Sequence, residues 1–247
     1  MRVKDIKKII FPDKCPVCGR IKPQWFTGDE SADGGKRVCA DCKPLIKYVT
    51  EPLCKKCGRK LSDETLEYCA DCRDYEHYFT EGRVIFEYDG EMKRIVYRFK
   101  YSNRRDLADY FAGSLSAGCE RWLSDKKIDV VIPIPLHPDK EKKRGYNQAK
   151  VFAEALSKRY GLKMYGDLLL RGRHTSPQKG LSRAERINNL KNAFILGQSG
   201  VKLNGLNLLL VDDIYTTGAT MDAAASVLKD EGVRDIYFLC ICSGVLT

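Results

Sequence analysis

The sequence predicts an α/β protein with a parallel sheet, preceded by a small cysteine-rich domain. After about residue 80, short apolar runs alternate with stretches of helical periodicity, a pattern typical of parallel strands covered by helices on both faces. Before that point, eight of the eleven cysteines fall in four C-x2-C pairs. The 247 residues leave room for both parts, and we place them at 1–80 and 81–247.

The cysteine pairs form two similar units in tandem. Each unit begins Cys-x-x-Cys-Gly-Arg and ends Cys-Ala-Asp-Cys, with 20 residues between the pairs of the first unit and 11 in the second. A C-x2-C turn aims two thiolates at one point, and two such turns complete the tetrahedral sulfur shell that suits zinc. Because both shells are filled, we expect about two zinc ions with structural roles. The expected ligands are Cys15, Cys18, Cys39, Cys42, Cys54, Cys57, Cys69 and Cys72.

Two other metal arrangements remain open at this point. The chain could bind one zinc ion and keep degenerate cysteines, or it could be cross-braced, with the first pair joined to the third and the second to the fourth. Disulfides are disfavoured because Met1–Phe11 lacks the apolar stretch of a secretory signal, and thiols in the cytoplasm stay reduced. No apolar run is long enough to cross a bilayer. We therefore expect a cytoplasmic protein with no membrane insertion.

The positive charge of the chain is concentrated in one segment. The formal net charge is +10, and residues 139–186 hold 13 lysines and arginines against 5 acidic residues. A local basic field attracts polyanions such as pyrophosphate, nucleotides or nucleic acid. The alternative is a solvated surface that happens to be rich in lysine.

Periodicity places the elements of the second part. Met92, Ile95, Val96 and Phe99 recur at helical spacing, and we expect the aromatic residues of this helix and the next to lie in the core. Ligands in parallel sheets bind at the carboxyl ends of the strands. The expected strands are 82–88, 128–135, 194–196, 206–211 and 236–242, with a short apolar run at 168–170, and the expected helices lie near 92–99, 105–123, 147–160 and 217–229.

One segment combines a strand end with a helix start. The apolar run before Asp212 and Asp213 ends in these two acids, and a loop of hydroxyl residues and Gly218 then opens a helix. A helix N-terminus attracts phosphate, glycine lets the backbone approach closely, and the acids can accept hydrogen bonds from ribose hydroxyls. We expect both carboxylates to face a ligand cavity rather than to be locked in internal salt bridges. An acidic turn with Thr217 as helix N-cap is the alternative, but it leaves the paired acids unexplained.

This segment resembles the phosphoribosyl pyrophosphate motif of type I phosphoribosyltransferases, which has a hydrophobic run, two acids and Thr-Gly-x-Thr. The resemblance implies the type I phosphoribosyltransferase fold, with phosphoribosyl pyrophosphate and Mg²⁺ as ligands. It makes Asp212 and Asp213 candidate catalytic as well as binding residues. The remaining candidates in the loop are Thr216, Thr217, Gly218, Ala219 and Thr220.

Two further segments fit the same resemblance. The strand expected at 128–135 ends in prolines, is followed by Leu136 and His137, and precedes a lysine-rich stretch. In the resembled fold the loop after this strand binds pyrophosphate. Glycine, serine, proline and charge between Arg171 and Leu190 predict a mobile loop, which in that fold closes over the site. The candidates for binding are Pro135, Leu136, Arg144, Asn147, Lys179 and Arg183, with Arg144 also a candidate catalytic residue.

The combination of motifs is more distinctive than any single one. The tandem cysteine units, Pro-Ile-Pro-Leu, Arg-Gly-Tyr-Asn-Gln and Val-Asp-Asp-Ile-Tyr-Thr-Thr-Gly-Ala-Thr together resemble the ComF family of bacterial competence proteins, from Cys15 to Cys242. The resemblance implies a double zinc ribbon joined to a phosphoribosyltransferase domain. It also implies a role in DNA uptake during natural transformation, with single-stranded DNA and DNA-uptake proteins as partners.

Two hypotheses about activity follow. In one, the protein binds phosphoribosyl pyrophosphate or a related nucleotide and handles DNA, with the zinc modules and the basic segment contacting DNA phosphates. In the other, it is a metabolic phosphoribosyltransferase acting on an unidentified base or amine. Thr216 stands where purine-base enzymes of this class commonly carry an acid, which weighs against base chemistry.

Overall fold

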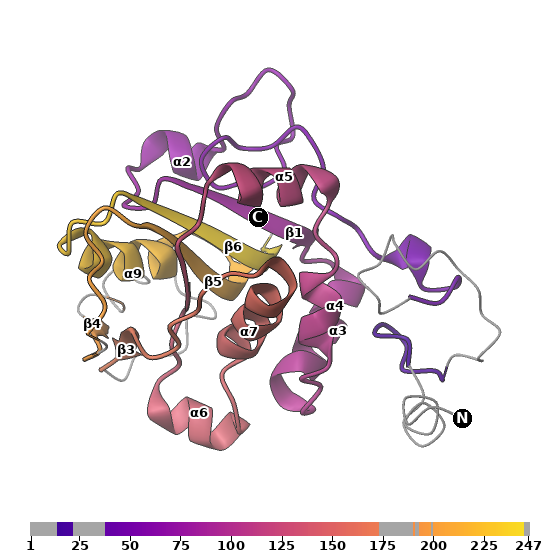
Figure 1. The fold of residues 1–247 in the computed structure, drawn as a ribbon. Coiled ribbons are helices and arrows are strands. Elements are labelled where there is room, and N and C mark those ends of the chain that lie inside the picture. The colour runs from indigo at the N-terminus through magenta and orange to yellow at the C-terminus, as the bar shows by residue number, and fades with distance from the viewer. Residues whose placement is uncertain (1–13, 22–37, 173–189, 191–192, 199, 245–247) are drawn as a thin grey trace.

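The centre of the protein is a four-stranded sheet in the order β1–β6–β5–β2, in which every strand pair is parallel (Figure 1). The computed structural model describes residues 14–21, 38–172, 190, 193–198 and 200–244. A parallel bridge from Val131 to Met164 extends the sheet beyond β2. The strands are β1 (Glu81–Glu87), β2 (Val130–Pro133), β5 (Asn207–Tyr215) and β6 (Asp235–Ser243).

Helices and a small second sheet surround these strands. A two-stranded antiparallel sheet is formed by β3 (Leu169–Arg171) and β4 (Phe194–Leu196). The helices among the described residues are α2 (Ala70–Asp74), α3 (Gly90–Tyr101), α4 (Leu107–Ala112), α5 (Ala117–Asp125), α6 (Pro138–Arg144), α7 (Gln148–Tyr160) and α9 (Ala219–Lys229), with the short 3-10 helix η1 over Lys43–Leu45. None of these helices has the length and apolar character needed to cross a membrane.

Different elements cover the two faces of the sheet. Successive side chains of a strand point to opposite faces of the sheet. The apolar side chains of β5 therefore contribute to two hydrophobic cores, one on each face. Leu209 and Val211 pack with α3, α4, α5 and α7, whereas Leu208 and Leu210 pack with α9 and the second cysteine unit. The predicted fold class, an α/β protein with a parallel sheet behind a cysteine-rich segment, is confirmed.

Three elements differ from the sequence-based expectation. The single helix expected over 105–123 is two helices, because the Ser116 side chain accepts a hydrogen bond from Cys119 and caps a new one. The lysine-rich stretch after β2 was expected as a loop but contains α6, which begins at Pro138 and ends before Gly145 in the left-handed conformation. Strand β5 continues to Tyr215, so both acids lie within it.

Helix α3 buries one face and exposes the other. Met92, Ile95, Val96 and Phe99 are all buried, as their spacing predicts. The expectation that the aromatic residues of this helix lie in the core is wrong for two of them, because Tyr97 and Tyr101 are 62% and 59% exposed. Their rings lie beside each other, with centroids 4.9 Å apart.

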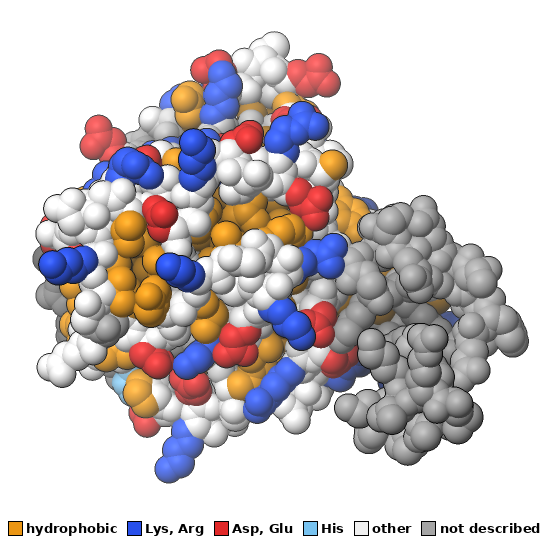
Figure 2. Space-filling model, viewed as in Figure 1, with side chains coloured by type: hydrophobic (Ala, Val, Ile, Leu, Met, Phe, Trp, Pro, Cys, Tyr) orange, Lys and Arg blue, Asp and Glu red, His pale blue; other side chains and the backbone are white. Residues whose placement is uncertain are grey.

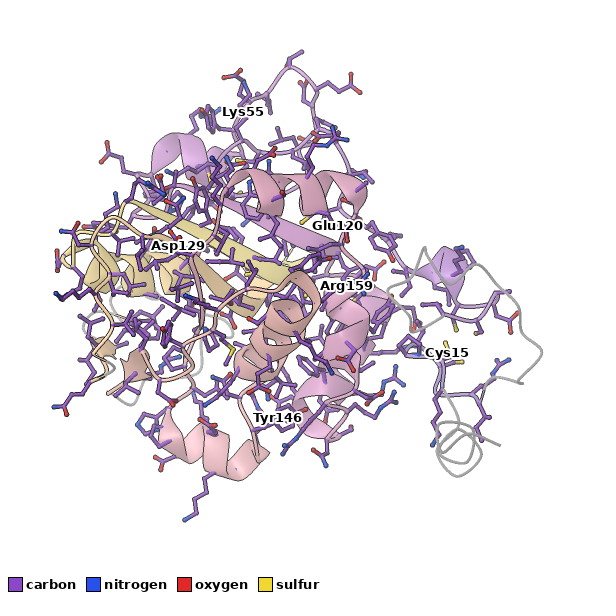
Figure 3. The ribbon with its side chains drawn as sticks, viewed as in Figure 1. Cys15, Lys55, Glu120, Asp129, Tyr146 and Arg159 are labelled. Atoms are coloured by element: carbon purple, nitrogen blue, oxygen red, sulfur yellow. The ribbon has the colours of Figure 1, made fainter. Side chains whose placement is uncertain are left out.

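The two cysteine units attach to the α/β part at separate places, as the labels of Cys15 and Lys55 in Figure 3 show. The first is held by α3, where the Arg98 guanidinium donates to the carbonyl oxygens of Pro16 and Val17. The second is held by β1, where the Gly82 amide donates to the Lys56 carbonyl oxygen at 2.8 Å. Each unit is therefore held to the α/β part by its own hydrogen bonds.

Candidate functional site: two sulfur tetrads and an acidic strand end ringed by cations

The eight paired cysteines form two tetrads. In each tetrad the sulfur atoms lie within 4.8 Å of one another, and all the cysteines are free thiols. The Sγ–Sγ distance is 3.8 Å from Cys18 to Cys39 and 3.7 Å from Cys57 to Cys69. A tetrahedron with zinc–sulfur bonds of about 2.3 Å has edges of about 3.8 Å, so both tetrads fit structural zinc. Because each tetrad takes its sulfurs from one unit, the cross-braced arrangement is excluded, and two complete tetrads favour two zinc ions over one.

An arginine–aspartate pair joins the two turns of each module. In the first module Arg20 and Asp41 are 3.1 Å apart, with side chains 72% and 71% exposed. The repeat places Arg59 and Asp71 at the same positions in the second module, 3.4 Å apart and only 8% and 14% exposed. The same local pair is thus a surface feature in one module and part of an interface in the other.

The two acids of the predicted ligand motif are consecutive residues near the end of β5. Asp213 Oδ2 is 2.9 Å from Lys100 Nζ, and both side chains are largely buried. This ion pair differs from the expectation that both carboxylates stand open to a ligand. Asp212 Oδ1 instead accepts a hydrogen bond from the Asp213 backbone amide at 2.8 Å.

Burial makes these charges interact strongly. Burial, with a contribution from Asp213, raises the pKa of Asp212 from 3.8 to about 7. Burial alone would lower the pKa of Lys100, but the attraction of Asp213 and Asp212 outweighs it and the pKa is raised. Asp213 is therefore paired with Lys100, whereas Asp212 is only partly ionised at neutral pH.

Three more cations converge on this edge. Burial, and then the charges of Arg171 and Arg144, lower the pKa of Lys140. Burial also lowers the pKa of Arg171, while Asp212 opposes that change. Arg144 donates to the Tyr101 hydroxyl at 3.2 Å and lies over its ring. The three cations therefore lie close enough for their charges to act on one another, and a polyvalent anion can bind to such a group of cations.

The loop after the acids leads directly into α9. Gly218 is the N-cap with φ of +81°, and no side chain caps the helix, so the alternative with Thr217 as N-cap is excluded. A Cβ atom at Gly218 would lie 2.8 Å from the Tyr215 hydroxyl and 3.0 Å from His77. Only glycine fits this turn, and the uncapped start of an eleven-residue helix is suited to a phosphate.

The other expected binding residues fall into three groups. The Asn147 amide caps α7 through the Ala149 amide and donates to the Ile134 carbonyl oxygen, both at 3.0 Å, so both its ends are engaged within the protein. Pro135 is buried and Leu136 half-buried at the end of β2. Lys179 and Arg183, in the segment expected to close over the site, lie outside the described residues.

The sequence did not single out every residue at this edge. Lys100 was missed because it lies on α3, far along the chain from the motif, and only the fold brings it to Asp213. Arg171 ends β3, directly after the apolar run at 168–170, and that position at a strand end was the available signal. Lys140 stood in the lysine-rich stretch but was not distinguished from its neighbours.

These features define a class of protein: an α/β domain with a parallel sheet that carries two zinc-ribbon modules. The family model named double zinc ribbon domain matches residues 6–73. Competence protein F of Haemophilus influenzae is 31% identical over 81% of this chain and 87% of its own length. Competence protein ComFC of Streptococcus pneumoniae is 30% identical over 90% of this chain and 96% of its own. The chain belongs to the ComF family of competence proteins.

Two more distant similarities complete the comparison. The DNA utilization protein YhgH of Escherichia coli is 25% identical over 88% of this chain and 95% of its own length. Among solved structures, adenine phosphoribosyltransferase from Thermoanaerobacter pseudethanolicus is similar over 57% of this chain and 83% of that chain, with 16% identity and a TM-score of 0.36.

The tetrads predict two zinc ions per chain, measurable by elemental analysis of the purified protein. Cys57→Ser should reduce the content to one, because three remaining sulfurs hold zinc poorly. Cys119→Ala, which changes a buried thiol outside both tetrads, should leave both ions in place. A folded, zinc-free wild-type protein would contradict the assignment.

The raised pKa of Asp212 predicts a pH-dependent stability. Between pH 3.8 and about 7 the folded protein holds a proton that the unfolded chain has lost, so stability falls as the pH rises through this window. Asp212→Asn should flatten that slope and stabilise the protein at pH 8 by roughly 1–3 kcal/mol. Urea unfolding across the window measures this. The exposed acid Asp230, changed to Asn, should leave the slope as it is.

Proposed function

We propose that this protein binds phosphoribosyl pyrophosphate with Mg²⁺ at the carboxyl end of β5, and that it serves DNA uptake in the cytoplasm by handling single-stranded DNA. The position of Arg171 close to Asp212, with Lys140 and Arg144 close to Arg171, carries the ligand assignment. The names of the relatives, competence protein and DNA utilization protein, support the cellular role.

The groups at this edge match the parts of the ligand. Asp212 and Asp213 can accept hydrogen bonds from ribose hydroxyls, and the uncapped start of α9 behind Gly218 can hold the 5-phosphate. Lys140, Arg144 and Arg171 can balance the diphosphate. Lys100 pairs with Asp213 and fixes it in place, which orients an acceptor for the sugar. Mg²⁺ bound together with the diphosphate would offset part of its negative charge.

Transfer chemistry is the alternative activity at the same site. Cations on the diphosphate and carboxylates beside the ribose would stabilise a cation-like transition state at the first carbon of the sugar. The Thr216 side chain cannot serve as an acid or base, and its carbonyl oxygen accepts from Arg59. We therefore favour binding without base chemistry. Pyrophosphate release with any member of a panel of bases and amines would favour the enzyme instead.

Isothermal titration with phosphoribosyl pyrophosphate and Mg²⁺ tests the ligand assignment. Replacing both acids, Asp212→Asn with Asp213→Asn, should weaken binding at least about 100-fold, since each charged hydrogen bond contributes about 1.5–3 kcal/mol. Zinc content should stay at two, because the tetrads are built from other residues. Asp125→Asn, at an exposed position of α5, is the control. Unchanged affinity in the double variant would contradict the site.

A local surface favours the DNA part of the proposal. Basic and acidic side chains are interspersed on the face shown in Figure 2, so the net charge of +10 does not gather there. A cleft of about 710 Å³ lies between the first zinc module and α3, lined by Arg20, Lys93, Arg94, Tyr97 and Arg98 among others. Exposed aromatic rings beside cations are typical of single-strand binding, where bases stack and phosphates pair.

Two of the cleft's arginines are already paired. Arg20 pairs with Asp41, and Arg94 pairs with Glu91 at 2.8 Å, with both arginine side chains mostly exposed. Exposed ion pairs contribute little to stability, and a phosphate can replace the acid as a partner. The cleft therefore offers two phosphate contacts at small cost in addition to the stacking face of Tyr97.

Single-stranded DNA affinity, measured by fluorescence anisotropy at several salt concentrations, tests this surface. The logarithm of the affinity should fall linearly with the logarithm of the salt concentration. Tyr97→Ala should weaken binding about 5- to 100-fold through loss of one stacked base, with the salt slope unchanged. Tyr165→Ala, at a tyrosine outside the cleft, should have no effect. Equal affinities for both variants and the wild type would show that single-stranded DNA does not bind in this cleft.

A further inference from the structure

We infer that the second zinc module positions the phosphate loop of the ligand site, with Arg59 as the positioning residue. The inference rests on the proposed function for the meaning of that loop, residues 216–220, but the contacts that carry it are independent of any ligand. Arg59, which follows the first cysteine turn of the second module, contacts the backbone of the loop. His77, which follows the second cysteine turn, contacts the first turn of α9.

Arg59 is the first of these connections. It follows the Cys57-Gly58 turn, and its side chain is almost fully buried. One nitrogen of its guanidinium donates to the carbonyl oxygen of Thr216, and another pairs with Asp71 of the second cysteine turn. The group also lies over the Tyr215 ring, 5.2 Å from its centroid. A single planar cation therefore links both turns of the zinc site to the loop.

The bond to Thr216 sets the orientation of a peptide. A trans peptide is planar, with its carbonyl and N–H on opposite sides. When Arg59 holds the Thr216 carbonyl oxygen toward the zinc module, the N–H of Thr217 points to the opposite side. A carbonyl oxygen turned toward the ligand would repel a phosphate, so this contact keeps the loop in the orientation that an anion requires.

His77 makes the second connection. Its Nδ1 lies 2.7 Å from Asp222 Oδ2, its Nε2 lies 3.6 Å from the Cys72 sulfur, and its ring stacks on Phe79. The other oxygen of Asp222 accepts from the Tyr78 amide at 3.0 Å. Asp222 belongs to the first turn of α9, so the helix start that follows Gly218 is attached to the same module.

The first module supplies the comparison that isolates this effect. Arg20 occupies the equivalent place in the repeat and pairs with the equivalent aspartate, Asp41, but it does so at the surface. A defect that comes from losing the arginine–aspartate pair alone should follow either substitution. A defect that comes from losing the loop contact should follow the substitution of Arg59 only.

The experiment compares Arg59→Met, Arg59→Lys and Arg20→Met with the wild type, all as full-length zinc-loaded protein. Amide hydrogen exchange of the peptide spanning 212–222, measured without ligand, reports the loop directly. We expect exchange at least about 10-fold faster in Arg59→Met, because a hydrogen bond to a charged donor is lost. Arg59→Lys should fall between, since an ammonium group cannot hold both acceptors as the planar guanidinium does. Arg20→Met should match the wild type.

Two further measurements separate the outcomes. Zinc content should be two in every variant, and affinity for phosphoribosyl pyrophosphate with Mg²⁺ should fall at least about 10-fold in Arg59→Met. Wild-type exchange rates in Arg59→Met with both ions bound would overturn the inference, and so would faster exchange accompanied by loss of one zinc ion, which would make Arg59 a support of the metal site.

The two proposals can fail separately. If the wild type does not bind phosphoribosyl pyrophosphate, the proposed function fails while the exchange comparison still decides the role of Arg59. If Arg59→Met does not fold, the exchange rate and zinc content of Arg59→Lys decide by the same criteria.

Discussion

Two neighbouring carboxylates at the end of a buried strand impose the constraint on which the rest of the site depends. Charges in such a position are costly unless cations match them. Lys100 supplies the match for Asp213, and it can do so only because the buried face of α3 fixes that helix against the sheet. Asp212 is left partly protonated, and the charge of Arg171 acts on it in addition to that of Lys100. This combination of carboxylates and cations is the basis of our proposal that the edge binds a ligand with both hydroxyls and negative charge.

Positively charged side chains also attach the two zinc modules to the α/β part. Each is too short to bury a core of its own, and structural zinc supplies roughly 10–16 kcal/mol in such peptides. Both are then held to the α/β part by arginine side chains that donate to backbone carbonyl oxygens: Arg98 of α3 for the first module and Arg59 of the second module itself. Helix α3 also carries Lys100, which pairs with Asp213, and Tyr101, which accepts a hydrogen bond from Arg144. It therefore connects the first module to both an acid and a cation of the proposed ligand site.

Sequence reasoning succeeded where the signal is local. The cysteine spacing determined both tetrads, and apolar runs located the strands, including β4 at its observed bounds. Local signals were also overlooked, since Pro138 and Gly145 are typical bounds of a helix, and an asparagine before a helix is a typical N-cap. The contact of Lys100 with Asp213 could not be predicted, because it depends on where a distant helix packs. The docking of Arg59 on the loop is non-local for the same reason.

The most direct measurement of the central claim is a crystal structure of the zinc-loaded protein with phosphoribosyl pyrophosphate and Mg²⁺. The account predicts ribose hydroxyls on Asp212 and Asp213, the 5-phosphate at the start of α9, and the diphosphate among Lys140, Arg144 and Arg171. A ligand bound elsewhere, or an edge that stays empty at saturating ligand with Asp213 still held by Lys100, would contradict it.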